Sequence, residues 1–485
     1  MIKYVNKNIT KVYETKDSRK AVLELLWGDR VEVLNNRKAN GRYKINARWA
    51  RGYFVRAEDL GDEPLLELYF IDVGQGDGVL VVTPDRKHLL IDGGYNRSKQ
   101  PHGKSAADFI DWKFKVDYNE DKIKLDAMIS SHCDADHYGG LWDLLLDREN
   151  NELETEETIV DHFYHAGVSW WKTDSKKRFL GKTENGYLVN LLTGITSIRN
   201  GLRSSSSLKL QGEWAKFLNK IKSSGAKVSR LSYNPEKGFD YLPGFEEDKE
   251  TSIKVLGPIE NTINGKPGLK DFKNDSQNTN GHSILLRLDY GNAKILLTGD
   301  LNKQSQQHIV ESLTGNRAEL AADVVKACHH GSDDCSYDFL QRVQAAVTII
   351  SSGDDESHAH PRPNIVAASG STGYIIIDDD ELKTPLVYST EISRSLKIGH
   401  PTKIKVGNAS NIDLDGNETV KVTYKRVRSG AIKPQTLQKP LRKLKVIDGI
   451  VYGLVNVRTD GNKILCAIMN EGKRKWECKT FNSRF

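Results

Sequence analysis

Short apolar runs separated by turn residues dominate the first 60 positions of the chain. Residues 21–26, 31–34, 42–45 and 52–56 each carry an apolar or alternating pattern over a few positions, and Gly28-Asp29 supplies a turn. Apolar residues do not recur here at the three-to-four spacing of an amphipathic helix. This stretch therefore predicts a small all-β domain over residues 1–60.

A different pattern follows Gly61-Asp62-Glu63-Pro64. Near-continuous apolar runs predict buried strands, and the spacing of residues 139–146 predicts a helix after one of them. These strands are expected at 65–73, 79–83, 88–91, 125–130, 283–290, 294–298, 324–328 and 347–351. Strands alternating with helices are typical of an α/β domain, which we place at 65–390.

Within that domain, residues 170–280 are less regular, and we interpret them in part as an insertion. The spacing of 212–221 predicts a helix, 252–256 a strand, and 266–281 a polar, turn-rich stretch. Beyond residue 390, apolar alternation at 420–427, 444–447, 450–457 and 464–469 predicts a separate small β domain over 400–485.

Charge is unevenly distributed along the chain. Residues 1–60 hold 14 basic and 7 acidic side chains, and residues 401–485 hold 18 and 7, although the formal net charge is only +6. An acidic centre therefore lies between two basic ends. Basic flanks can follow a polyanion such as nucleic acid, because lysine and arginine release counterions from phosphates. They can equally serve only to keep the protein dispersed in water.

Cysteine content and hydropathy indicate in which cellular compartment the protein is expected. Five cysteines among 485 residues are too few and odd in number for a disulfide framework, which favours a reducing environment. No apolar stretch approaches the roughly 20 residues of a membrane helix. The first twenty residues lack the apolar core of a secretory signal. We therefore expect a cytoplasmic protein with no membrane partner.

The chemistry concentrates where strands end. Ser131-His132-Cys133-Asp134-Ala135-Asp136-His137 follows the strand at 125–130 and carries two imidazoles and two carboxylates. Asp300, the pair His329-His330 and the segment His358-Ala359-His360 follow later strands in the same way. Imidazole and carboxylate at this density suit Zn²⁺, Mn²⁺ or iron. We expect these groups to meet at one edge of a sheet sandwich.

The order of these motifs resembles the metallo-β-lactamase superfamily and, within it, the soluble hydrolase domain of ComEC-like competence proteins. The resemblance spans about 65–370 and rests on ELYFIDVGQGDGVLV, LLIDGG, MISSHCDADHYGGL, ILLTGD, KACHHGSDDCS and HAHP. It implies a four-layer αββα sandwich with a two-metal hydrolase site at one end. Residues 1–60 are similar to bacterial SH3-like domains, which implies a peptide or protein ligand for that domain.

The resemblance also implies roles for individual residues. His132 and Asp134 would hold one divalent ion, Asp136 and His137 the other, with Asp300 bridging them and either His329 or His330 as a late ligand; Asp77 and Asp92 would support the site. Asp136 or Asp300 would shuttle a proton, and His360 would protonate the leaving group. Because Asp134 replaces a histidine of the usual motif, Mn²⁺ is an alternative to Zn²⁺. A further histidine ligand has no clear match, although His162, His165 and His282 lie in the relevant interval.

These inferences predict a metal-dependent phosphodiesterase, with a nuclease acting on DNA through a metal-activated hydroxide as the leading hypothesis. Seven basic residues are expected to contact the nucleic-acid backbone: Lys421, Lys425, Arg426, Arg428, Arg442, Lys443 and Lys445. One alternative is an esterase for a small or cell-wall phosphoester of the phosphocholine type. Another is a non-catalytic binding protein whose metal site is structural, although a site with open positions argues against that reading.

Overall fold

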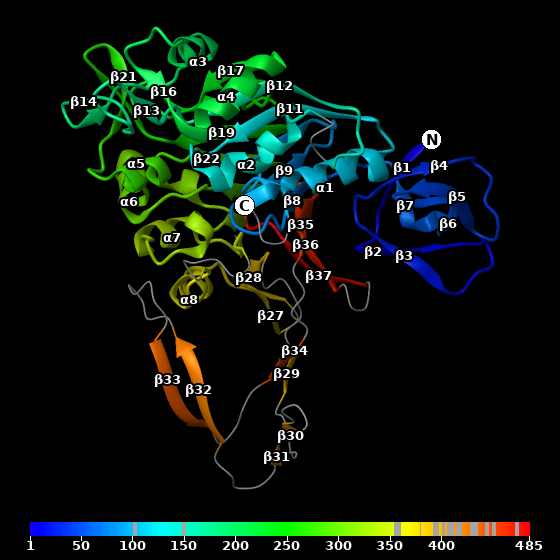
Figure 1. The fold of residues 1–485 in the computed structure, drawn as a ribbon. Coiled ribbons are helices and arrows are strands. Elements are labelled where there is room, and N and C mark those ends of the chain that lie inside the picture. The colour runs from blue at the N-terminus through cyan, green and yellow to red at the C-terminus, as the bar shows by residue number, and fades with distance from the viewer. Residues whose placement is uncertain are drawn as a thin grey trace.

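The structure is a computed structural model of the whole chain (Figure 1). It describes all residues except 100–103, 148–151, 354–359, 379, 391–396, 400–402, 405–411, 414–419, 427–434, 442–445, 449–452 and 471–474. Among the described residues, no helix combines the length and apolar content needed to cross a bilayer.

The N-terminal 61 residues form an antiparallel seven-stranded sheet, drawn in blue at one side of Figure 1. In spatial order its strands are β3 (Ala21–Leu26), β2 (Ile9–Tyr13), β6 (Ala50–Arg56), β5 (Arg42–Ala47), β4 (Arg30–Val33), β1 (Ile2–Val5) and β7 (Leu60–Gly61). Val12, Leu25, Val31 and Ile45 fill its interior. The predicted β content of this region is confirmed, whereas the likeness to SH3-like domains stays a prediction.

Two large sheets form the centre of the molecule. The first has nine strands in the order β17 (Lys227–Arg230), β12 (Glu157–His165), β11 (Lys122–Ser130), β10 (His88–Ile91), β9 (Val79–Val82), β8 (Leu66–Phe70), β35 (Val455–Thr459), β36 (Lys463–Asn470) and β37 (Lys475–Asn482). The second has seven, in the order β18 (Asp240–Tyr241), β19 (Thr251–Gly257), β22 (Leu285–Tyr290), β23 (Ala293–Leu297), β24 (Val324–Lys326), β25 (Val347–Ile350) and β28 (Leu386–Ser389).

Helices cover the outer face of each sheet, which confirms the predicted α/β sandwich (Figure 1). The helices are α1 (Ala106–Trp112), α2 (Ala135–Leu144), α3 (Ile195–Leu202), α4 (Gly212–Ser224), α5 (Asp275–Gly281), α6 (Lys303–Ser312), α7 (Tyr337–Val343) and α8 (Pro363–Thr372), with shorter turns η1 (Ala57–Asp59), η2 (Arg97–Lys99), η3 (Lys113–Tyr118), η5 (Arg317–Leu320) and η6 (Cys328–Gly331). Helices α1 to α4 pack on the nine-stranded sheet, and α6 and α7 on the other. Phe70, Ile129, Leu286 and Val347 fill the space between the two sheets.

Smaller ribbons complete the fold. One pairs β13 (Trp171–Lys172) with β16 (Lys209–Leu210), and another joins β14 (Thr183–Glu184), β15 (Tyr187–Leu188), β21 (Lys266–Lys270) and β20 (Glu260–Ile263). Four further two-stranded ribbons pair β26 (Ile376–Asp378) with β27 (Glu381–Thr384), β29 (Lys397–Gly399) with β34 (Val446–Asp448), β30 (Lys403–Ile404) with β31 (Ile412–Asp413), and β32 (Val420–Arg426) with β33 (Gln435–Leu441).

Two sequence expectations differ from the structure. The segment 266–281, read as turn-rich, contains β21 and α5, and the Asn274 side chain caps α5 by accepting from the backbone of Ser276 and Gln277. The domain expected over 400–485 is not wholly separate. Strand β35 pairs antiparallel with β8, so β35 to β37 extend the central sheet. These strands alternate like those of an independent domain, because alternation does not reveal which strand a segment pairs with.

Candidate metal centre

The sheet topology places the site. Strands β10 and β11 run parallel in the first sheet, as do β23, β24 and β25 in the second. Their carboxyl ends lie at one end of the sandwich, where loops can carry polar side chains into a shared space. The loop after β11 bears His132 and Asp134, and α2 begins directly afterwards at Ala135. Asp136 and His137 thus lie in the first turn of a helix.

Glycines bring three loops unusually close at this end. Gly76, in the GQGD loop, has φ of 115°, and a Cβ there would lie 1.9 Å from the backbone oxygen of Asp136. A Cβ on Gly140 of α2 would lie 2.0 Å from the backbone oxygen of Gly93. A side chain at either position would force these segments apart, so glycine lets both loops pack against the start of α2.

The predicted residues from separate strand ends meet in a buried cluster. The Nε2 of His137 lies 3.3 Å, and the Nε2 of His330 3.0 Å, from Oδ2 of Asp300. The rings of His132 and His137 have centroids 4.0 Å apart. Four overlapping groups among the described residues could each hold a cation; one joins Asp92 with Asp77 and His137, and the other three are His132, His137 and Asp300; Asp136, His137 and His330; and Asp77, Asp300 and His330. The last three groups contain six different residues. We call these six residues the metal cluster.

Asp92 and Asp77 hold the imidazoles from behind. Oδ2 of Asp92 lies 2.8 Å from Nδ1 of His137, and its Oδ1 accepts the Ser131 N–H at 2.7 Å. Oδ1 of Asp77 lies 3.1 Å from Nδ1 of His330. A carboxylate on Nδ1 fixes the ring and leaves Nε2 for a metal. Both Asp77 and Asp92 also belong to groups whose ligand atoms lie close enough together to hold a cation, so either could serve as a ligand as well as a support.

The structure distinguishes the two adjacent histidines of η6. Both have positive φ, 47° for His329 and 52° for His330. His330 points into the cluster and is 1% exposed. His329 lies at the rim, with Nε2 3.7 Å from Asp300 and 3.3 Å from Nδ2 of Asn280. The geometry favours His330 as the inner ligand.

The remaining predicted residues lie around the cluster. Oδ2 of Asp134 is 3.7 Å from Nε2 of His132, at the partly exposed edge. The ring of His360 lies 5.7 Å from that of His329 and 6.3 Å from that of His330, centroid to centroid, so it flanks the opening. His358 lies outside the described residues.

The three histidines considered as a further ligand lie elsewhere. His162 and His165 are on β12, and His165 is buried on the face of the sheet that carries Phe163 and the helices. His282 hydrogen-bonds the Lys270 carbonyl oxygen at 2.8 Å through Nε2 and stacks on Phe272. None of the three belongs to the ligand groups found among the described residues.

Electrostatics make the cluster attractive to cations. Burial alone would lower the pKa of His137, but the carboxylates of Asp300, Asp92 and Asp136 hold that pKa well above its usual value. Burial likewise opposes charge on His330, and Asp300 and Asp77 outweigh it, so its pKa is also raised well above the usual value. A field strong enough to favour imidazolium also favours a metal ion in the same place.

Two other groups show the balance of forces. Burial, reinforced by nearby His137, lowers the pKa of His132 to about 3, which leaves a neutral imidazole. Burial and the adjacent Asp136 carboxylate raise the pKa of Asp134 to about 6. Neutral imidazole is the form that binds metals.

The donor set fits divalent metal. The Nε2 atoms of His132, His137 and His330 are buried and make no well-aligned hydrogen bond among the described residues, although those of His137 and His330 lie within ion-pair distance of Asp300. Such atoms are costly to bury unless a partner satisfies them. Nitrogen and carboxylate oxygen together match the ligands of Zn²⁺ and Mn²⁺. His132, His137, His330, Asp136 and Asp300 would hold such ions.

Sequence reasoning missed several neighbours of the site. Lys326 is 2% exposed, forms an ion pair with Asp77 and donates to the Gly299 carbonyl oxygen at 2.9 Å. Burial opposes its charge, but Asp77 and Asp300 raise the pKa of Lys326. A lysine ending an otherwise apolar strand was the signal available. Gln75 donates to Oδ2 of Asp136 at 3.1 Å, and Asn280 contacts His329 from α5.

The structure describes the side chains of none of the seven residues expected to contact nucleic acid. Lys421, Lys425 and Arg426 belong to β32, for which the backbone alone is described. Arg428, Arg442, Lys443 and Lys445 lie outside the described residues. Their role remains a prediction from composition.

Comparison with known families fits this geometry. The model of the metallo-beta-lactamase superfamily matches residues 71–332, just over half of the chain. That range includes every member of the metal cluster. The chain therefore belongs to the metallo-β-lactamase superfamily. Membership, together with the histidine and aspartate groups, supports a metal-dependent hydrolase.

Two curated proteins are similar to the chain. ComE operon protein 3 of Bacillus subtilis (strain 168) is 25% identical over 307 residues, which cover 62% of this chain and 30% of that protein. Competence protein ComA of Neisseria gonorrhoeae is 36% identical over 83 residues, covering 17% and 12%. The chain thus spans less than a third of the length of these relatives.

One solved structure gives a weaker match. A protein of unknown function from Enterococcus faecalis V583 shares 12% identity, with a TM-score of 0.24, over 57% of this chain and 56% of the other. A likeness at that level supports no inference about fold or activity.

Proposed function

We propose that the protein is a metal-dependent phosphodiesterase that cleaves DNA. The observation that carries this proposal is the convergence of three buried imidazole Nε2 atoms with the carboxylates of Asp136 and Asp300. A purely structural metal site would be closed by its ligands. Here Asp134 and His360 are partly exposed at the edge of the cluster, which leaves an approach for a substrate.

Two divalent ions, Zn²⁺ or Mn²⁺, complete the proposal. Bound in this site, they would polarise a phosphodiester and lower the pKa of the attacking water. Asp92 would keep His137 oriented through Nδ1, and Gln75 would fix one oxygen of Asp136. Asp136 or Asp300 would accept a proton from the water. His360, beside the opening, would donate one to the departing oxygen.

The choice of DNA rests on two supports outside the cluster. The relatives are named as competence and ComE operon proteins. Residues 401–485 carry 18 basic and 7 acidic side chains, a composition suited to phosphate backbones. If this basic segment contacts DNA, affinity falls as the salt concentration rises. Each phosphate contact removed by mutation is then expected to reduce the slope of log affinity against log salt concentration by about 1.

The test is a substrate panel with metal-loaded full-length protein. Plasmid, single-stranded DNA, RNA, cyclic dinucleotides and a chromogenic phosphodiester are incubated with Mn²⁺ or Zn²⁺, and bound metal is measured by elemental analysis. We expect cleavage of DNA and its loss in the double variant Asp136→Ala/His137→Ala. The exposed Asp248→Asn serves as control, since its carboxylate lies far out in solvent.

The alternatives are outcomes of the same panel. Turnover of phosphocholine esters without turnover of DNA supports the small-molecule esterase and refutes the nuclease. Metal bound at full occupancy without turnover of any substrate supports a structural site. Cleavage of DNA that survives the double variant indicates a contaminant and removes the metal cluster from the argument.

A further inference from the structure

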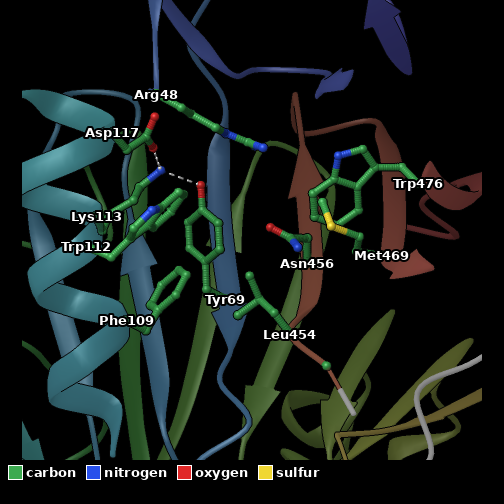
Figure 2. Close-up of a pocket in the computed structure, with 11 residues that line it drawn as sticks. Arg48, Tyr69, Phe109, Trp112, Lys113, Asp117, Leu454, Asn456, Met469 and Trp476 are labelled. Carbon is green, nitrogen blue, oxygen red and sulfur yellow. Dashed lines mark hydrogen bonds and ion pairs between the residues drawn. The ribbon is translucent and has the colours of Figure 1, made fainter. Parts of the chain in front are cut away.

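A cavity of about 270 Å³ lies where the N-terminal sheet meets the central sandwich. Figure 2 shows Tyr69, Phe109 and Trp112 on one side, from β8 and α1, and Met469 and Trp476 on the other, from β36 and β37. It shares no residue with the metal cluster. Aromatic walls on opposing sides suit a flat ring system, since rings stack in offset or edge-to-face contact.

Asn456 supplies a polar group inside this apolar space. It lies on β35 directly opposite Tyr69 of β8 and is 1% exposed. Its carboxamide lies in the cavity between Tyr69 and Met469 (Figure 2). Nδ2 is buried and has no hydrogen-bond partner among the described residues. A buried donor without a partner is unfavourable, so an acceptor on a bound molecule would stabilise this site.

The charges lining the cavity are balanced. Lys113 Nζ donates to Tyr69 Oη at 2.8 Å and to Asp117 at 2.5 Å, which Figure 2 marks with dashed lines. Nη2 of Arg48 donates to Asp29 at 2.7 Å. Because each cation among the described lining residues already faces a carboxylate, these residues give the cavity no excess charge to attract an ion. The molecule that fits it is neutral in its ring portion.

A second hollow of about 260 Å³ adjoins the first and shares Phe109, Gly453 and Leu454 with it. This part is more polar. Asp72 accepts from Lys104 at 2.9 Å, and Asp108 forms an ion pair with Arg97. Carboxylates balanced in this way can still accept hydrogen bonds from hydroxyl groups. They offer no surplus positive charge for a phosphate.

We propose that the two hollows form one binding site for a neutral nucleoside. The base lies between the aromatic walls, and a ring nitrogen or carbonyl accepts from Nδ2 of Asn456. The sugar extends into the second hollow, where its hydroxyls donate to Asp72 and Asp108. The site is separate from the metal cluster, and it includes Arg48 of the N-terminal sheet, so that sheet takes part in binding.

Calorimetry and saturation-transfer NMR on the full chain test the proposal with adenosine, guanosine, cytidine and uridine and with their 5′-monophosphates. We expect at least one nucleoside to bind with a micromolar Kd and its monophosphate to bind about tenfold more weakly or worse. Asn456→Leu keeps side-chain size among apolar walls and removes the donor. It is expected to weaken binding by about tenfold, one hydrogen bond to a buried group.

Leu454→Trp fills the cavity without removing a polar contact and is expected to abolish binding. Asn219→Leu, on the exposed face of α4, is the matched control and binds as wild type. His137→Ala also binds as wild type, which separates this site from the metal cluster. No nucleoside binding up to millimolar concentration, or equal binding by wild type and both cavity variants, overturns the proposal. Tighter binding of the monophosphate than of the nucleoside overturns it too.

Discussion

Two buried groups of charged residues lie in this molecule, and they are built in opposite ways. The metal cluster gathers three aspartates and three histidines, and the Nε2 atoms of these histidines make no well-aligned hydrogen bond among the described residues. The other group, which we call the junction cluster, comprises Asp29, Glu67, Lys113 and Arg458. It joins the N-terminal sheet to the central one. Nη1 of Arg458 lies 2.8 Å from Asp29 and donates to the Trp27 carbonyl oxygen at 2.7 Å.

The difference lies in how charge is satisfied. In the junction cluster each side chain faces an opposite charge: Lys113 pairs with Asp117, and Arg458 with Asp29 and Glu67. In the metal cluster three carboxylates, those of Asp77, Asp136 and Asp300, share one permanent cation, the buried ammonium of Lys326, and otherwise face imidazoles that are charged only when protonated. Complementary buried charge fixes two parts of a fold together, whereas carboxylates and imidazoles that converge on one buried space favour the binding of a cation there.

The largest expected effect concerns the junction cluster. Arg458→Met leaves the carboxylates of Asp29 and Glu67 buried without this partner, so it is expected to lower the free energy of unfolding by about 3–5 kcal/mol. Denaturant unfolding measures the change. The double variant Arg458→Met/Asp29→Leu should recover part of the loss. Arg56→Met, which removes an exposed pair between the end of β6 and Glu58 of η1 in the N-terminal domain, should change stability by less than about 1 kcal/mol. Equal effects for the two arginines would contradict the comparison.

Removing a carboxylate from the metal cluster is expected to weaken the binding of its cation. Asp300→Asn removes the carboxylate that faces the Nε2 atoms of both His137 and His330. Turnover of a chromogenic phosphodiester is expected to fall more than about 100-fold, beyond the cost of losing an outer hydrogen-bond partner. Wild type should gain about 2.7 kcal/mol of stability at a metal concentration of 100 times Kd, and the variant almost none. Thermal unfolding with and without metal tests this, with Asp248→Asn as control.

Local pattern predicted much of this site. His132, Asp136 and Asp300 follow largely apolar strands, and the ends of such strands share one edge. Which of His329 and His330 points inward depended on a tight turn with two positive φ values, for which adjacent histidines give no local signal.

Long-range pairing explains what pattern could not predict. Lys326 is buried beside its partner Asp77, which lies on a loop distant in sequence. Asn280 contacts His329 from α5, a helix whose polar residues gave the pattern of a turn. The pairing of β35 with β8 joins segments from opposite ends of the chain, and the charges that accompany it, Arg458 with Asp29, belong to residues equally far apart. The periodicity of a sequence depends on residues close together in the chain, so it does not predict contacts between residues far apart.

A substitution at Asp92, which lies behind His137 of the metal cluster, tests the same comparison with a smaller expected effect. Asp92→Asn keeps an oxygen for the Ser131 N–H but weakens the hold on Nδ1 of His137. Apparent metal affinity is expected to fall about 10- to 100-fold, the usual cost of an outer partner. Titrating metal into apo-protein while following turnover measures it. Thr83→Val, which alters a turn remote from the cluster, is the control. Unchanged metal affinity would mean that Asp92 only braces the loop.

Acid should weaken the junction cluster within a defined window. Burial opposes ionisation of Asp29, but Arg458 and Arg48 prevail and lower its pKa from 3.8 to about 2. A lowered carboxyl pKa stabilises the fold above the unfolded value near 3.8, and this contribution is lost as pH falls towards 2. The amount is about 2 kcal/mol.

Urea unfolding of metal-free protein between pH 2 and 6 checks this sign, with Asp29→Asn as the reference. The difference in stability between wild type and the variant should be constant above about pH 5 and shrink below pH 4. Removing metal keeps the titration of its ligands out of the comparison. A constant difference down to pH 2 would show that Asp29 titrates alike in the folded and unfolded chains. The junction would then owe its strength to apolar packing around Trp27 and Trp476 rather than to paired charge.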